Sequence, residues 1–178
     1  FVSLIDFDLG RFTGNASLGT ATLDVNVEGQ GFTTEKLNTE VIGQVYSLTF
    51  NEYTYSDIAV SGILKEQLFD GSLKSNDPNF RFTFSGLADF GNDVNTFNFT
   101  ASVENADLVR LNFIQDSIAV LKGDLNMDIT GNNLDDMSGD IRFSRTSFQN
   151  ADSTYYFEDF KVSSAFDTDS VRTIDINS

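Results

Sequence analysis

The polar side chains of this chain offer few combinations that could carry out covalent chemistry. The sequence of 178 residues contains no His and no Cys. It therefore lacks the imidazole and thiolate groups that serve as general bases, nucleophiles or zinc ligands. Ser72 and Lys74 lie two residues apart and share one face of an alternating segment, but that face is the polar one. We therefore predict no catalytic residues and no enzyme activity.

Glycoside hydrolases use two carboxylates as acid and as base or nucleophile. The chain offers two such pairs, Asp135 with Asp136 and Glu158 with Asp159. Both pairs adjoin residues typical of turns, where carboxylates are usually solvated and do no chemistry. We interpret them as turn residues.

The candidate metal ligands are also interpreted as turn residues. The segments Asp167-Thr168-Asp169 and 132–136 are rich in oxygen ligands, but the calcium-loop pattern of an EF-hand is absent. We expect no cofactor and no dedicated metal site, and the sequence leaves open whether calcium binds these turns.

The charge balance narrows the choice of partners. With 27 acidic and 11 basic side chains the net charge is −16, which disfavours nucleic acid and anionic membrane surfaces. No apolar run approaches the roughly 20 residues of a membrane-spanning helix. The chain starts at Phe1 inside an apolar segment and stops within the alternation at Ile174–Ser178, so we expect a fragment of a longer protein.

The elements that carry these residues alternate between apolar and polar side chains with a period of two, which indicates β-strands with one apolar and one polar face. The clearest runs are 23–27, 80–84, 97–103 and 125–129, and clusters of Gly, Asn and Asp such as 76–79 separate them. The pattern predicts an all-β antiparallel meander of about ten strands. We expect almost no helix, with a single turn possible at 33–38 or 106–112.

An internal repeat accompanies the alternation. Residues 23–29 align with 125–131, and residues 53–61 align with 155–163, both at an offset of 102. We therefore predict one fragment of a repetitive protein, residues 1–178, with two partial repeats at about 20–100 and 122–178. Repeats of this kind stack into elongated arrays.

The aromatic content, with 18 Phe and 5 Tyr, permits two interpretations. Alternating Phe residues are the usual core of a β-sandwich. Alternatively, the apolar face lines a groove that holds lipid tails. The composition alone favours the sandwich core, whereas the repeat, the ends of the chain and the lack of any pattern that divides the strands into two sheets favour the groove.

Several phrases of the sequence resemble the TamB proteins of the AsmA-like group. They are Phe84-Ser85-Gly86-Leu87-Ala88-Asp89-Phe90, the segment 97–108, Thr130-Gly131-Asn132-Asn133-Leu134 with its continuation to Gly139, and 155–160. The resemblance covers most of the chain and includes no catalytic signature.

The resemblance implies an elongated U-shaped trough, a β-taco, whose apolar groove shields phospholipid acyl chains between the inner and outer membranes. It also implies a periplasmic location in the cell envelope, an inner-membrane anchor elsewhere in the full-length protein, and an outer-membrane β-barrel assembly protein of the TamA/BamA type as partner. We expect an isolated fragment to self-associate through its open edge strands.

On this basis we predict which residues line the groove and which face water. Asp24, Asn26, Asn98, Asp128 and Asp140 should face water. The expected lining consists of Leu23, Val25, Val27, Phe80, Phe82, Phe84, Phe97, Phe99, Val103, Leu125, Met127, Ile129, Ile141 and Phe143.

Two rival folds remain at this point. One is an adhesin- or lectin-like β-sandwich that binds ligands through its loops and has no lipid groove. The other is a closed lipocalin-like barrel that holds one small molecule.

Overall fold

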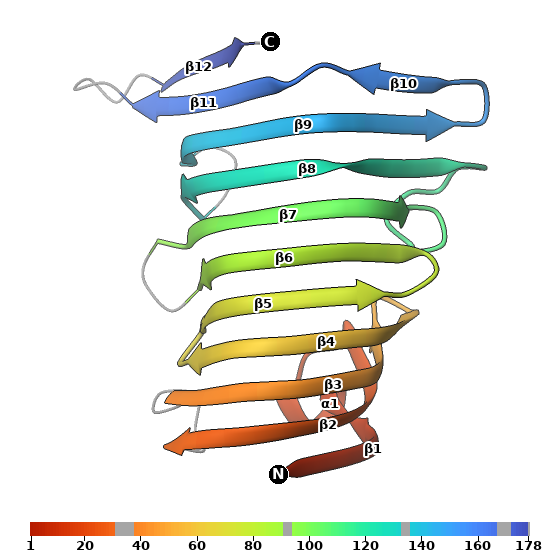
Figure 1. Ribbon diagram of the computed structural model, residues 1–178, viewed down its shortest axis with the longest axis vertical. Helices are drawn as coiled ribbons and strands as arrows, with labels where there is room; N and C mark the ends of the chain where they lie inside the picture. Colours follow the sequence, from red (N-terminus) through yellow and green to blue (C-terminus); the bar gives the residue numbers. More distant parts are fainter. Residues whose placement is uncertain (31–37, 91–93, 133–135, 167–171, 178) are drawn as a thin grey trace.

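The structure is a computed structural model that describes residues 1–178 except 31–37, 91–93, 133–135, 167–171 and 178. It contains twelve strands and one short helix (Figure 1). In chain order these are β1 (Val2–Asp8), α1 (Leu9–Thr13), β2 (Leu18–Gln30), β3 (Asn38–Phe50), β4 (Tyr53–Lys65), β5 (Leu68–Asn76), β6 (Phe80–Asp89), β7 (Thr96–Asp107), β8 (Ala119–Thr130), β9 (Ser138–Asn150), β10 (Thr154–Phe157), β11 (Phe160–Phe166) and β12 (Arg172–Asn177).

The strands form a single open antiparallel sheet in which each strand pairs with its neighbours in the sequence. The exception is β10, which pairs with β9 alone and not with β11, so β11 also pairs with β9 and then with β12. The predicted all-β antiparallel meander is confirmed, with more strands than the ten expected. The lipocalin-like barrel is excluded, since β1 and β12 are the separate ends of the strand order.

The only helix among the described residues is α1, which the sequence pattern did not predict. The Asp8 carboxylate accepts a hydrogen bond from the Arg11 amide, and Gly14 ends the helix in the left-handed conformation at φ 73°. Residues 33–37 of one predicted turn lie outside the described part. In the other, β7 continues to Asp107 before the chain turns.

The sheet has two chemically different faces, because directly opposed residues of antiparallel strands lie on the same side. We call one side the apolar face. One row of cross-strand partners defines it from β2 to β11: Val25, Gly43, Val60, Leu73, Phe84, Ala101, Leu125, Phe143 and Phe160. The polar face carries the intervening residues.

A line of backbone irregularities crosses the sheet at right angles to the strands. The register shifts in β1, in the β2–β3 pair and in the β6–β7, β7–β8 and β8–β9 pairs. Asp6, Asp57 and Arg145 on this line have φ near +50°, a value uncommon for residues other than Gly. Bulges bend strands and increase their twist. This bulge line therefore divides the sheet into two parts with different surroundings.

On one side of the bulge line, residues 108–118 between β7 and β8 fold back over the apolar face. We call this segment the strap and the strand ends beneath it the strap end. Leu111 of the strap is fully buried in a cluster with Tyr55 and Ala106. The Asn51 side chain donates to the Asn112 carbonyl at 3.2 Å, and the Asn112 side chain donates to the Asn51 carbonyl at 3.1 Å. These reciprocal bonds join the strap to the β3–β4 turn.

Asp77, in the β5–β6 turn, stabilises the strap end through hydrogen bonds to β4 and to its own turn. Its carboxylate, 1% exposed, accepts hydrogen bonds from the Tyr53 hydroxyl at 2.6 Å, the Ser56 amide and hydroxyl, and the amides of Asn79 and Phe80. Burial raises the pKa of this carboxyl, but these donors outweigh it and hold the pKa below its usual value. Burial and the Asp77 carboxylate raise the pKa of Tyr53 to about 12.

The two aligned sequence segments occupy similar positions in the strand order. Residues 23–29 lie in β2 and 125–131 mainly in β8, while 53–61 lie in β4 and 155–163 span β10 and β11. Asp57, with its positive φ, falls where the alignment places the break between β10 and β11. The repeat itself stays a prediction.

Candidate functional site: an open apolar face

The register places all the predicted groove residues on the apolar face. Residues 23, 25 and 27 of β2 connect through β3, β4 and β5 to residues 82 and 84 of β6, and onward to β9. Most of them are half-buried, whereas Val25 and Ile129 are buried and Val27 is exposed. Phe80 and Val103 stand apart, because they pack against the strap cluster.

Aromatic rings form a connected strip along the middle of this face. The ring centroids of Phe69 and Phe84 are 6.0 Å apart, and those of Phe84 and Phe99 are 4.8 Å apart. Farther along the sheet, the rings of Phe143 and Phe160 stack at 4.6 Å. Tilted and stacked rings at these separations attract each other beyond their buried area. Contacts between its own rings thus help to order the strip.

Near one end of the strands, Thr39, Val41 and Ile129 of the apolar face are buried. At the other end, the strap end, segments of the described chain pack over the face. The strap lies there over Tyr55 and Ala106, and Phe12 of α1 contacts Phe7 of β1 with ring centroids 5.5 Å apart. At the opposite ends of the strands, which we call the open end, β6 and β8 finish and β7 and β9 begin (Figure 1). Successive cross-strand rows of apolar side chains follow one another along the strands, from the open end to the strap.

The residues predicted to face water lie on the polar face. Asn98, Asp128 and Asp140 are direct cross-strand neighbours, and the Asn98 amide donates to the Asp128 carboxylate at 3.3 Å. Asp128 and Asp140 would repel each other, but Lys161 lies 2.8 Å from Asp140. Hydrogen bonds from Lys161 and Ser163 lower the pKa of Asp140. Asp24 and Asn26 occupy the same face in β2.

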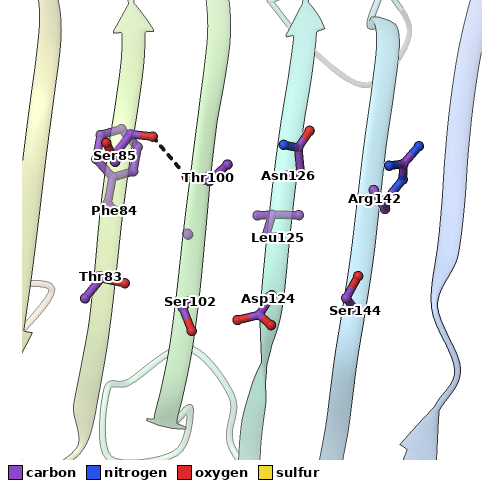
Figure 2. Close-up of a pocket in the computed structure, with 11 residues that line it drawn as sticks. Thr83, Phe84, Ser85, Thr100, Ser102, Asp124, Leu125, Asn126, Arg142 and Ser144 are labelled. Carbon is purple, nitrogen blue, oxygen red and sulfur yellow. Dashed lines mark hydrogen bonds between the residues drawn. The ribbon is translucent and has the colours of Figure 1, made fainter.

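The polar face also has a shallow hollow of about 300 Å³ that the sequence did not predict. Figure 2 shows its lining on four neighbouring strands, β6 to β9. Asp124 and Arg142 are its charged groups, and Thr100 donates to the Ser85 carbonyl at 3.4 Å. A hydrogen bond from Ser102 and the neighbouring Arg145 lower the pKa of Asp124. Five of its eleven lining residues are Ser or Thr, which are common on the polar face of any strand, so no sequence motif marks the hollow.

The candidate chemical residues do not form a reactive arrangement. Ser72 lies on the polar face with its hydroxyl 3.5 Å from the Ser61 carbonyl. Asp159 accepts a hydrogen bond from the Arg145 amide at 3.3 Å. Its neighbour Glu158 also lies in the break between β10 and β11.

The possible calcium ligands are only partly described. The Asp136 carboxylate accepts from the Asn132 amide at 2.8 Å, while Asp135 and residues 167–169 lie outside the described residues. Among the described residues, no group of three or more His, Cys, Asp or Glu side chains could hold a metal ion.

Comparisons with known proteins add no relative. No family model matches the chain, and no curated protein or solved structure matches it. Within the described residues, the structure contains no helix with the length and apolar character needed to cross a membrane.

Proposed function

We propose that this chain is a segment of an envelope lipid-transfer conduit, in which the apolar face shields phospholipid acyl chains from water. The observation that carries the proposal is the continuous apolar face, which extends across neighbouring strands and whose central rings, Phe84 and Phe99 among them, are only half-buried. Apolar surface that stays accessible across several strands marks a face that meets apolar partners.

The energetics suit transfer better than tight storage. Each acyl methylene removed from water contributes about 0.8 kcal/mol. A face made of similar apolar rows offers this gain at every step along the sheet, so a tail moves between rows without a large barrier. Such a process requires no nucleophile, no base and no cofactor, which suits a chain without His and Cys.

The β-sandwich alternative, a binding module of the adhesin or lectin kind, needs a second sheet packed on the apolar side. The described strands belong to one sheet, and the rings of the central strip are half-buried. This observation favours the lipid groove.

The wider biological setting is part of the same proposal. By its resemblance to TamB-like proteins, we place the chain in the periplasm, within a longer protein anchored in the inner membrane. Its partners would be phospholipids and, through other regions, an outer-membrane assembly protein of the TamA/BamA type. The edges of β1 and β12 provide the unpaired backbone groups through which isolated copies self-associate.

Native mass spectrometry of the purified chain tests the lipid proposal. We expect phospholipid adducts after gentle purification, and recovery of those adducts when a delipidated sample meets phospholipid vesicles. The matched control is the Phe99→Asp variant, which should remain folded and lose the adducts. A wild-type chain that carries no lipid before or after exposure to vesicles would contradict the proposal.

A further inference from the structure

The polar face of the sheet carries a second hollow that adjoins the one in Figure 2. The first, of about 300 Å³, crosses β6 to β9, and the second, of about 460 Å³, crosses β3 to β6. Thr83 and Ser85 of β6 line both of them. The two hollows therefore form one depression that runs across the strands from β3 to β9, which we call the polar groove.

Hydroxyl side chains follow one another along the floor of the polar groove. Ser61, Ser72, Ser85 and Thr100 are successive cross-strand partners in β4, β5, β6 and β7, and all four are exposed. The next row toward the open end carries larger side chains, such as Leu87 of β6. Because a hydroxyl both donates and accepts hydrogen bonds, this floor suits a ligand that is itself rich in hydroxyl groups.

Two exposed cations line the polar groove, Lys74 on β5 and Arg142 on β9. Within the described part of the chain, neither side chain forms an ion pair or a hydrogen bond, although Arg142 attracts the Asp140 carboxylate at a longer distance. Among the described lining residues the single carboxylate is Asp124, which already pairs with Arg145. The groove is therefore locally positive in a chain whose net charge is −16.

Acidic side chains lie beside the polar groove and not along its floor. Glu40, Asp70, Asp128 and Asp140 share the next cross-strand row toward the open end, where Lys161 binds Asp140. An anionic group is attracted by the cations of the groove and repelled by the acidic row. This charge pattern confines an anionic ligand to the groove and aligns it across the strands.

We propose that the polar groove binds an acidic oligosaccharide, with carboxylates of the sugar chain on Lys74 and Arg142 and its neutral hydroxyls on the Ser and Thr floor. The two cations are four strands apart, which is about 19 Å at the usual spacing of strands. A single small anion cannot reach both, whereas an extended sugar chain can. The guanidinium fork of Arg142 matches a carboxylate. The site lies on the face opposite the lipid groove, so the inference is independent of the proposed function.

The test compares two sugar chains of equal length that differ in charge. Hexagalacturonate carries a carboxylate on every unit, and maltohexaose carries none. Isothermal titration calorimetry of the full chain at low ionic strength measures both affinities, because salt screens exposed charges. We expect wild type to bind hexagalacturonate about tenfold more tightly than maltohexaose, as two exposed ion pairs would give.

Lys74→Gln and Arg142→Gln should each weaken hexagalacturonate binding about threefold, and the double variant about tenfold, with maltohexaose unaffected. Lys65→Gln is the matched control, since it removes one exposed charge from the same face of β4 outside the groove and should change neither affinity. Ser85→Tyr fills the groove at the exposed position that both hollows share. It should abolish binding of both sugars while circular dichroism shows an unchanged fold.

Three results would overturn the site. Equal affinity of wild type for the two sugars, or no binding of hexagalacturonate, would refute recognition by Lys74 and Arg142. The same loss in Lys65→Gln as in Lys74→Gln would reduce the effect to net charge. Undiminished binding by a folded Ser85→Tyr variant would place the sugar outside the polar groove. None of these results bears on the phospholipid adducts, which report on the opposite face.

Discussion

The strap end and the open end of the apolar face contain similar residue types but differ in what their side chains contact. At the strap end, Leu111, Tyr55 and Asp77 are buried and their contacts come from within the chain. Along the aromatic strip most rings are half-buried, as Phe84 and Phe99 are, while Val41 and Ile129 nearer the open end are buried. The comparison shows that one apolar stripe serves as a core at the strap end and remains partly accessible along its centre.

The largest loss of stability should follow removal of the Asp77 carboxylate. Asp77→Ala leaves five hydrogen bonds unmade at a buried site, and we expect a decrease of about 4 kcal/mol in the free energy of unfolding. Urea unfolding followed by circular dichroism measures it. Asp57→Asn is the control, since it neutralises an exposed carboxylate and Asn tolerates the left-handed backbone there. Equal losses in the two variants would contradict the assignment of Asp77 as the main anchor.

Leu111→Ala should lower the free energy of unfolding by about 3 kcal/mol, because it leaves a cavity beneath the strap. Leu64→Ala, at a half-buried position near the open end of the same face, should lower it by about 1 kcal/mol. Thermal and urea unfolding of both variants measure the difference. Similar values would show that the two ends of the face are equally well covered.

Phe99→Asp should reverse this pattern by affecting ligand binding more than stability. Phe99 is half-buried and contacts Phe84 on the aromatic strip. We expect a stability decrease of about 1 kcal/mol and loss of bound phospholipid in native mass spectrometry. An unfolded Phe99→Asp variant would show instead that the aromatic strip is a core.

The smallest effect should be the pH dependence of stability around the strap end. Asp77 has a pKa below its usual value in the folded chain, so its contribution is present above about pH 4 and is lost as pH falls further. Tyr53 has its pKa raised to about 12, so its contribution is present below about pH 10 and is lost as pH rises toward that value. Unfolding midpoints across pH measure both. Asp77→Asn should reduce the fall of the unfolding midpoint at acidic pH, and Tyr53→Phe should reduce its fall at alkaline pH. A pH dependence that is the same in wild type and variants would contradict this assignment.

The sequence predicted the sheet better than it predicted the strap. Strict alternation at 80–84 and 97–103 leaves little freedom in the choice of face, so the pattern predicted which residues share one face of the sheet. That these residues line a lipid groove stays a prediction. The strap was not predicted, because its apolar residues follow no strand or helix period and the contact of Leu111 with Tyr55 joins distant parts of the sequence. Helix α1 is too short to show a helical period.

The face of β12 was not predicted either, for a related reason. It depends on the pairing of β12 with β11, and the sequence 172–177 shows only two apolar residues to set that register. The positive φ angles at Asp6, Asp57 and Arg145 carry no glycine signal, so the line across the sheet becomes visible only when neighbouring strands are aligned.

The strand order determines how copies of this sheet can join. The path from β1 to β12 passes through eleven strands, and adjacent strands are antiparallel throughout, so the two outermost strands point in the same direction. Stacking copies head to tail would therefore bring β12 and the next β1 together as parallel strands, with slanted hydrogen bonds. A two-fold axis at β12 instead gives an antiparallel pair and keeps the phenylalanine-rich sides of both copies on one continuous surface. The directions of the two edge strands thus determine that an open filament would use a parallel pair and a closed dimer an antiparallel pair.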